Sequence, residues 1–308
     1  MNPLLARLHP YPFERLRHLF ADVTPHPSFS PISLGIGEPR HATPPLIIEA
    51  LTRHTDELAT YPATAGSLAF REACANWVRR RYGVTLNPNT QVLPVNGSRE
   101  ALFSFAQTVL DGNPESLVVS PNPFYQIYEG AALLGQAQVH YVPSMASKNF
   151  AVDWDSVPVN IWQRTRLLFV CSPGNPTGAV MPLSEWKKLF ELSDQHGFVI
   201  ASDECYSEIY FGDKPPLGGL QAASQLGRTD FKRLMCFTSL SKRSNVPGLR
   251  SGFVAGDAQW IAPFLRYRTY HGSAMGGMVQ QASIAAWNDE THVHANRALY
   301  KEKFDQVT

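Results

Sequence analysis

Short apolar runs alternate with longer amphipathic segments through the middle of the chain. Each run is bounded by turn-forming residues and is rich in β-branched or aromatic side chains, which is typical of buried strands. The longer segments repeat their apolar positions at helical spacing. We therefore predict strands at 91–95, 117–120, 138–142, 166–171, 198–203, 233–238 and 250–255, separated in part by helices at 99–110, 125–134 and 183–196.

This alternation predicts the fold class. Strands separated by helical segments imply right-handed βαβ units and a mainly parallel sheet of seven strands, covered by helices on both faces. The connection between the last two strands is about a dozen residues rich in Ser, Pro and Gly. Because that length is at the lower limit for a parallel crossover, we expect the last strand to run antiparallel to its neighbours.

Helical periodicity also marks both ends of the chain. Thr43 precedes Pro44 and Pro45 as a good helix start, and a further helix ends in the basic run 79–81, which we expect to be a solvated last turn. We predict a large α/β domain over 41–290. Residues 1–40 and 291–308 are expected to form a smaller second domain, which is incomplete here. The remaining predicted helices are 11–23, 258–270, 277–288 and 291–306.

Composition and charge narrow the class of protein. With 44% hydrophobic and 17% charged residues, the chain of 308 residues is typical of a globular protein. A formal net charge of +1 gives no electrostatic reason to expect nucleic acid or a membrane surface as partner. The four cysteines lack CxxC spacing, no apolar run approaches membrane-spanning length, and the N-terminus lacks a signal-peptide core. We expect a cytoplasmic protein without a metal site, and we expect His292 and His294 to be surface features.

Polar residues suited to chemistry follow several of the predicted strands. In an open α/β sheet, ligands bind beyond the carboxyl ends of the strands. Gly97-Ser98-Arg99 opens a helix after the first strand, where backbone N–H groups favour a phosphate. Phe124 and Tyr125 follow the second strand and could stack on a flat ring.

The later strands add an amide, an acid, a phenol and an amine. Asn175 lies in the tight turn 172–178, and Asp203 ends the fifth strand three residues before Tyr206. Lys242 follows the sixth strand. A partly desolvated lysine can attack a carbonyl, and hydroxyls with a guanidinium suit a phosphate dianion. Pyridoxal phosphate (PLP) carries both groups. Taken singly, these stretches could equally be a helix cap, a strand-end acid, core aromatics and a solvated Lys/Ser loop, but their combination at one sheet edge favours PLP.

The motifs also carry a family resemblance. Ser-Pro-Gly-Asn-Pro-Thr-Gly from Ser172, Asp-Glu-Cys-Tyr from Asp203 and Ser-Leu-Ser-Lys-Arg-Ser-Asn-Val-Pro-Gly-Leu-Arg-Ser-Gly from Ser239 are similar to the most specific motifs of the fold-type I, class I/II PLP-dependent aminotransferases. Tyr61 and Gly66, with the residues that follow, are similar to a fourth motif. The resemblance runs from about residue 35 to about residue 281.

The resemblance implies roles for individual residues. Lys242 would bind the cofactor covalently and act as general base and acid, and Asp203 would keep the pyridine nitrogen protonated. Asn175 and Tyr206 would hydrogen-bond the phenolic oxygen, and Tyr125 would stack on the ring. The phosphate would be bound by Ser98, Arg99, Ser239, Ser241 and Arg250.

The resemblance further implies an assembly and a substrate pocket. Tyr61 would reach the phosphate of the partner subunit, which implies a homodimer with active sites at the interface. Gly37 would line the pocket for the substrate carboxylate, together with Asn175. In the family, the arginine that binds this carboxylate lies in a C-terminal segment, so we expect it beyond Thr308 and do not assign Arg297 to that role.

The substrate is indicated less sharply than the cofactor. The opening residues 2–16 and the run 34–40 are similar to aminotransferases of lysine and diaminopimelate biosynthesis that act on N-succinyl-LL-2,6-diaminopimelate and 2-oxoglutarate. The same motifs would suit an aspartate, aromatic or acetylornithine aminotransferase, or a carbon–sulfur β-lyase. A non-catalytic PLP-binding sensor would need a DNA-binding domain before residue 35, where too few residues remain. A nucleotide-binding protein is disfavoured because GxxxxGK[ST], and GxGxxG after a strand, are absent.

Overall fold

The computed structural model describes residues 1–308 and contains one seven-stranded sheet. The strand order is β1-β7-β6-β5-β4-β2-β3. Five strands from β3 to β6 pair in parallel, whereas β7 is antiparallel to both β1 and β6, as the short connection before it predicted. The strands are β1 (Val92–Val95), β2 (Leu117–Asn122), β3 (Gln138–Pro143), β4 (Thr165–Cys171), β5 (Val199–Asp203), β6 (Leu234–Ser239) and β7 (Gly252–Gly256).

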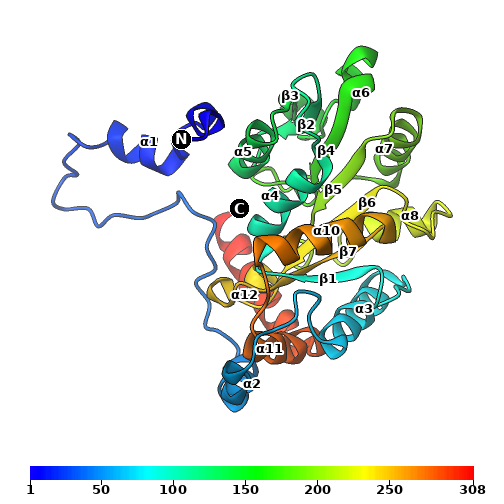
Figure 1. Cartoon of the computed structure of the whole chain (residues 1–308). Helices are drawn as coiled ribbons and strands as arrows, with labels where there is room; N and C mark the ends of the chain where they lie inside the picture. Colours follow the sequence, from blue (N-terminus) through cyan, green and yellow to red (C-terminus); the bar gives the residue numbers. More distant parts are fainter.

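Helices cover both faces of this sheet (Figure 1). One face packs against α4 (Ser98–Val109), α5 (Gln126–Leu134) and α10 (Ala258–His271). The other packs against α3 (Leu68–Tyr82), α7 (Leu183–His196), α8 (Gly219–Gln225) and α11 (Gly277–Asn288). The predicted α/β fold with a mainly parallel sheet is therefore confirmed. The remaining α-helices are α1 (Pro12–Leu19), α2 (Pro45–Arg53), α6 (Val159–Arg164), α9 (Leu240–Arg243) and α12 (Thr291–Val307).

Alternation along the strands produces two hydrophobic cores. In β6, Leu234 and Cys236 face one core, while Met235 and Phe237 face the other. Each large apolar side chain that is fully buried stabilises the fold by about 1.5–3 kcal/mol. With both faces buried, the strand ends are fixed in position, and the loops that follow them can hold side chains at defined places.

Three local predictions were wrong because tertiary contacts override local signals. The Arg81 side chain is only 9% exposed and pairs with Glu208 at 2.7 Å, so the basic run is not simply a solvated turn. Thr43 does not cap α2, because its hydroxyl donates to the carbonyl of Asn245. His294 is exposed as predicted, but the His292 side chain is only 7% exposed, and its ring contacts Asp289 and Ser244 at 2.6 and 2.8 Å.

The N-terminal segment differs most from its prediction. The first helix, α1, ends at Leu19, four residues earlier than periodicity suggested. The stretch from residue 20 to residue 40 contains no helix or strand and leaves apolar side chains such as Leu34 exposed. In Figure 1 this part of the chain extends away from the main body before it returns at α2. Among all the helices, none has the length and apolar character needed to cross a membrane.

Candidate active site

A cleft of about 790 Å³ lies at the carboxyl ends of the parallel strands. Loops that follow β1, β2, β4, β5 and β6 line it, together with the N-terminal segment around Gly37. The structure thus brings together most of the residues that the sequence singled out. Those that line the cleft are Gly37, Ser98, Arg99, Tyr125, Asn175, Asp203, Tyr206, Ser241, Lys242 and Arg250.

Lys242 is placed by a short helix that begins directly after β6. The hydroxyl of Ser239 accepts a hydrogen bond from the Ser241 amide at 3.1 Å, which caps α9 and fixes its start. The Lys242 carbonyl accepts a hydrogen bond from Asn296 of α12 at 3.2 Å. Burial lowers the pKa of Lys242, since desolvation disfavours the ammonium form. The amine is therefore more readily deprotonated than a surface lysine.

Asp203 ends β5 and is 7% exposed. Its Oδ2 accepts a hydrogen bond from the Tyr128 hydroxyl at 2.8 Å, and its Oδ1 accepts one from the Cys205 amide at 3.3 Å. No lysine or arginine forms an ion pair with it, and burial raises its pKa. A buried carboxyl of this kind is suited to a ligand that presents a positively charged N–H group.

Tyr128 was missed by the sequence reasoning. It lies in the first turn of α5, three residues after the N-cap Tyr125, and the centroids of the two rings are 5.9 Å apart. Its ring stacks on Phe169 at a centroid separation of 4.4 Å. That packing aims the hydroxyl at Asp203 and holds the carboxyl in place.

The N-terminus of α4 forms a cradle for an anion. Gly97 is the N-cap with φ +86° and ψ 155°, and no side chain caps the helix. A β-carbon at Gly97 would overlap the guanidinium of Arg250, which lies directly over this turn. The Arg250 guanidinium donates to the carbonyls of Pro247 and Asn96 at 2.8 and 3.4 Å. Free helix N–H groups and a guanidinium therefore converge on one point of the cleft.

Burial favours the neutral form of two phenols and a thiol in the cleft. Burial raises the pKa of Tyr125 to about 12 and also raises the pKa of Tyr206. Burial also raises the pKa of Cys205, whose thiol donates to the hydroxyl of Ser98 at 2.8 Å. An added β-carbon at Gly37 would lie 3.6 Å from the Tyr206 hydroxyl, so this glycine borders the phenol closely. The phenols can therefore act as hydrogen-bond donors.

Two predicted site residues lie outside the cleft. Ser239 is 1% exposed, and its hydroxyl donates to the Ser251 carbonyl at 3.0 Å. It also forms a hydrogen bond with the hydroxyl of Ser241, which lines the cleft, and its predicted contact with a phosphate stays a prediction. Tyr61 is fully exposed and borders a separate hollow beside Gln280. Its predicted contact with a partner subunit stays a prediction.

Comparison with known proteins agrees with this arrangement. The family model for aminotransferase class I and II matches residues 30–308. The chain belongs to this family. As a class I/II aminotransferase it is a PLP-dependent transaminase, which acts on amino acid and 2-oxo acid substrates. Enzymes of this family are generally dimeric.

Individual relatives are similar over most of this aminotransferase. An LL-diaminopimelate aminotransferase from Nitratidesulfovibrio vulgaris is 35% identical over 98% of the chain and 77% of its own length. An aminotransferase of known structure from Neisseria meningitidis is 57% identical, with a TM-score of 0.96 over 100% of this chain and 78% of its own. The aminotransferase AspB from Helicobacter pylori is 38% identical, with a TM-score of 0.91 over 97% and 78% of the two chains.

The donor set of the cleft fits PLP. Asp203 is a buried acid without a cationic partner, which matches a protonated ring nitrogen. The α4 N-terminus with Gly97 and Arg250 matches a phosphate. The amine of Lys242, whose pKa burial lowers, matches an aldehyde. Each reactive part of the cofactor thus has a counterpart among residues that line one cavity or shape its wall.

Proposed function

We propose that this aminotransferase transfers the amino group of N-succinyl-LL-2,6-diaminopimelate to 2-oxoglutarate. The observation that carries the proposal is the 35% identity with LL-diaminopimelate aminotransferases over 98% of the chain, which supports a diaminopimelate-type donor. The similarity of residues 34–40 to enzymes that act on the N-succinyl form supports that form over the free diamino acid. The products would be the 6-oxo acid and glutamate.

The residues of the cleft suggest how the reaction proceeds. When bound, PLP supplies an electrophilic aldehyde and a ring that withdraws electrons from the substrate α-carbon. Lys242 Nζ would bind the cofactor in the resting enzyme. It would then take the proton from the substrate α-carbon as a general base and return a proton as a general acid. Its lowered pKa favours the role of base, because burial makes the neutral amine more accessible than in a surface lysine.

The remaining cleft residues would orient the cofactor. Asp203, aimed by Tyr128, would hold the proton on the ring nitrogen. Asn175 and Tyr206 would donate hydrogen bonds to the phenolic oxygen, and Tyr125 would stack on the ring.

Anion-binding groups would hold the two ends of the reactants. The α4 amides near Ser98 and Arg99, with Ser241 and Arg250, would bind the cofactor phosphate, and Gly37 would border the substrate carboxylate.

A homodimer with shared active sites is part of the proposal. Tyr61 is fully exposed in the single chain, as expected of a side chain that is covered only on assembly. Apolar residues of the segment 20–40, including Phe29 and Leu34, are exposed as well and would be buried in such a dimer. Size-exclusion chromatography with light scattering should report a dimer. Tyr61→Phe should weaken PLP binding and leave the dimer intact.

A screen of half-reactions tests the substrate. The PLP-loaded enzyme would be mixed in turn with N-succinyl-LL-diaminopimelate, LL-diaminopimelate, acetylornithine, glutamate, aspartate and aromatic amino acids, and loss of the cofactor's visible band would be followed. We expect the fastest conversion with the N-succinyl compound and with glutamate. Faster conversion of free LL-diaminopimelate, or ammonia release without 2-oxoglutarate, would overturn the proposal in favour of another donor or a β-lyase.

A further inference from the structure

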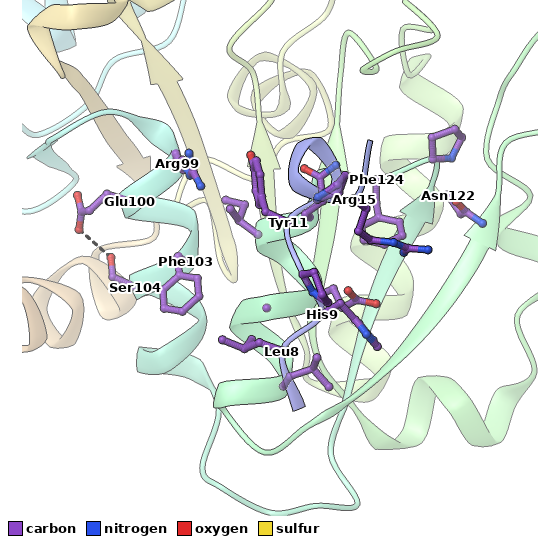
Figure 2. Close-up of a pocket in the computed structure, with 18 of the residues that line it drawn as sticks. Leu8, His9, Tyr11, Arg15, Arg99, Glu100, Phe103, Ser104, Asn122 and Phe124 are labelled. Carbon is purple, nitrogen blue, oxygen red and sulfur yellow. Dashed lines mark hydrogen bonds between the residues drawn. The ribbon is translucent and has the colours of Figure 1, made fainter. Parts of the chain in front are cut away.

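A second cavity of about 920 Å³ opens beside the cleft (Figure 2). It lies between the N-terminal residues that precede and begin α1 and the helices α4 and α5. Tyr11, Arg99, Phe124 and Arg250 line both cavities, so the two spaces share a common wall and mouth. A substrate that reacts at Lys242 could therefore extend into the second cavity.

The acidic residues of this cavity are already engaged. Glu100 accepts two hydrogen bonds from the guanidinium of Arg268, at 2.6 and 2.8 Å. Glu129 accepts a hydrogen bond from the hydroxyl of Tyr141. Glu100 is thus neutralised by an arginine that does not line the cavity, whereas Glu129 is bonded only to a neutral phenol and keeps its charge.

The arginines of the cavity, in contrast, have no acidic partner. The side chain of Arg15 has no ion-pair or hydrogen-bond partner within the chain, and the Arg99 guanidinium lies 5.3 Å from the centroid of the Tyr11 ring. Figure 2 shows Arg99 on one side of Tyr11 and Arg15 on the other. Arg15, Arg99 and Arg250 face only one carboxylate without a basic partner, that of Glu129, so the cavity has an excess of positive charge, with Arg99 nearer the cleft and Arg15 farther out.

The walls between these cations are partly apolar. Leu8 from the N-terminal segment, Phe103 from α4, and Ile127 and Leu133 from α5 line the cavity. Apolar walls that end at an unpaired guanidinium suit a short methylene chain that ends in a carboxylate. A succinyl group has this chemistry.

We propose that the second cavity binds the acyl arm of the amino donor and that Arg15 binds its terminal carboxylate. The inference rests on the proposed function, since it assigns the residue that distinguishes an N-succinyl donor from the free diamino acid. Arg15 is a specificity residue here and takes no part in the proton transfer at Lys242.

Binding of unreactive probes tests the assignment directly. N-succinyl-L-2-aminopimelate lacks the amino group that reacts, and N-acetyl-L-2-aminopimelate lacks in addition the terminal carboxylate. Titration calorimetry with PLP-loaded wild type should show the succinyl probe binding about tenfold more tightly than the acetyl probe, because a charged hydrogen bond is lost with the carboxylate. In Arg15→Gln this preference should disappear, while the affinity for the acetyl probe stays within twofold of wild type.

Arg17→Gln is the matched control, because Arg17 is an exposed arginine on the same helix that does not line the cavity. It should keep the full preference for the succinyl probe. An unchanged preference in Arg15→Gln, or an equal loss in Arg17→Gln, would overturn the subsite.

Turnover separates this inference from the proposed function. If wild type converts N-succinyl-diaminopimelate and Arg15→Gln raises KM for it about tenfold while kcat is kept, both are supported. If Arg15→Gln leaves KM unchanged, the donor assignment stands and the subsite is wrong. If wild type converts no diaminopimelate compound, the proposed function fails, and the probe titrations alone decide whether the cavity binds a carboxylate arm.

Discussion

Replacement of Gly97 by alanine is expected to strain the backbone of the folded protein and, through Arg250, to weaken PLP binding. Gly97 has φ +86° and ψ 155°, a region that is essentially restricted to glycine, and a non-glycine residue there costs about 1–3 kcal/mol. The added β-carbon would also overlap the guanidinium of Arg250. Because the far end of that side chain is the part that can move, the guanidinium should swing away from the α4 N-terminus.

Loss of the guanidinium removes a charge-assisted hydrogen bond to the phosphate, worth about 1.5–3 kcal/mol. Titration of the apo protein with PLP, followed by visible absorption, should therefore give a Kd raised at least tenfold in Gly97→Ala. Arg250→Ala should cause a similar loss, and the two losses should not add in the double variant, since both remove the same contact.

Gly197→Ala is the matched control for backbone strain. Gly197 ends α7 with φ +83°, and a β-carbon there would meet no atom within 4 Å. This variant should lower Tm slightly and leave the PLP Kd unchanged. A wild-type Kd in Gly97→Ala, or fully additive losses with Arg250→Ala, would refute the assignment of this turn as the phosphate cradle.

Other substitutions test the remaining features of the site and its support. Asp203→Asn should lower kcat at least 100-fold, because an amide cannot hold the ring nitrogen in its protonated form. Since burial raises the pKa of Asp203, the ionised carboxylate destabilises the folded apo protein at pH 7, and the apo variant should be at least as stable as wild type. A lower Tm of the apo variant would count against this reasoning. Burial lowers the pKa of Lys242, so the folded apo protein binds fewer protons than the unfolded chain up to about pH 10.4. The Tm of the apo wild type relative to that of Lys242→Met should therefore rise as pH increases towards that value. A Tm difference that stays constant with pH would contradict the lowered pKa. Glu208→Gln should cost about 3 kcal/mol of stability, because the 4% exposed Glu208 carboxylate pairs with two arginines. Glu191→Gln breaks an exposed ion pair and should change stability by less than about 0.5 kcal/mol. Equal effects of the two substitutions in a thermal melt would contradict this prediction.

Much of the fold could be predicted from the sequence because the strands are buried on both faces. Continuous apolar runs such as Leu234–Ser239 are hard to place anywhere else, and their boundaries fell within two residues of the observed ones. The antiparallel direction of β7 was predicted from the short connection between β6 and β7. The first helix was predicted too long: α1 ends at Leu19, because the helical periodicity of the sequence continues beyond the last turn of the helix.

The candidate site was predicted less completely, because sequence order shows strand ends but not what packs on them. Asp203 and Lys242 were placed correctly in one cavity, since carboxyl ends of parallel strands meet at one edge. Ser239 is not among the residues that line the cleft, and its hydroxyl caps α9 and contacts Ser241, a role that the strand-end pattern did not show. The contact of Tyr128 with Asp203 joins residues 75 positions apart, and the partners of Arg81 are more distant still. Such contacts depend on tertiary structure and leave no local signal.

The most direct test of this account is where the cofactor attaches. Borohydride reduction of the PLP-loaded enzyme, followed by digestion and mass spectrometry, should find a pyridoxyl group on Lys242 and on no other lysine. Lys242→Ala should still bind PLP in the cleft but yield no reduced adduct. A single-site adduct on another lysine in wild type, or an undiminished adduct in Lys242→Ala, would contradict the assignment of the cleft as the active site.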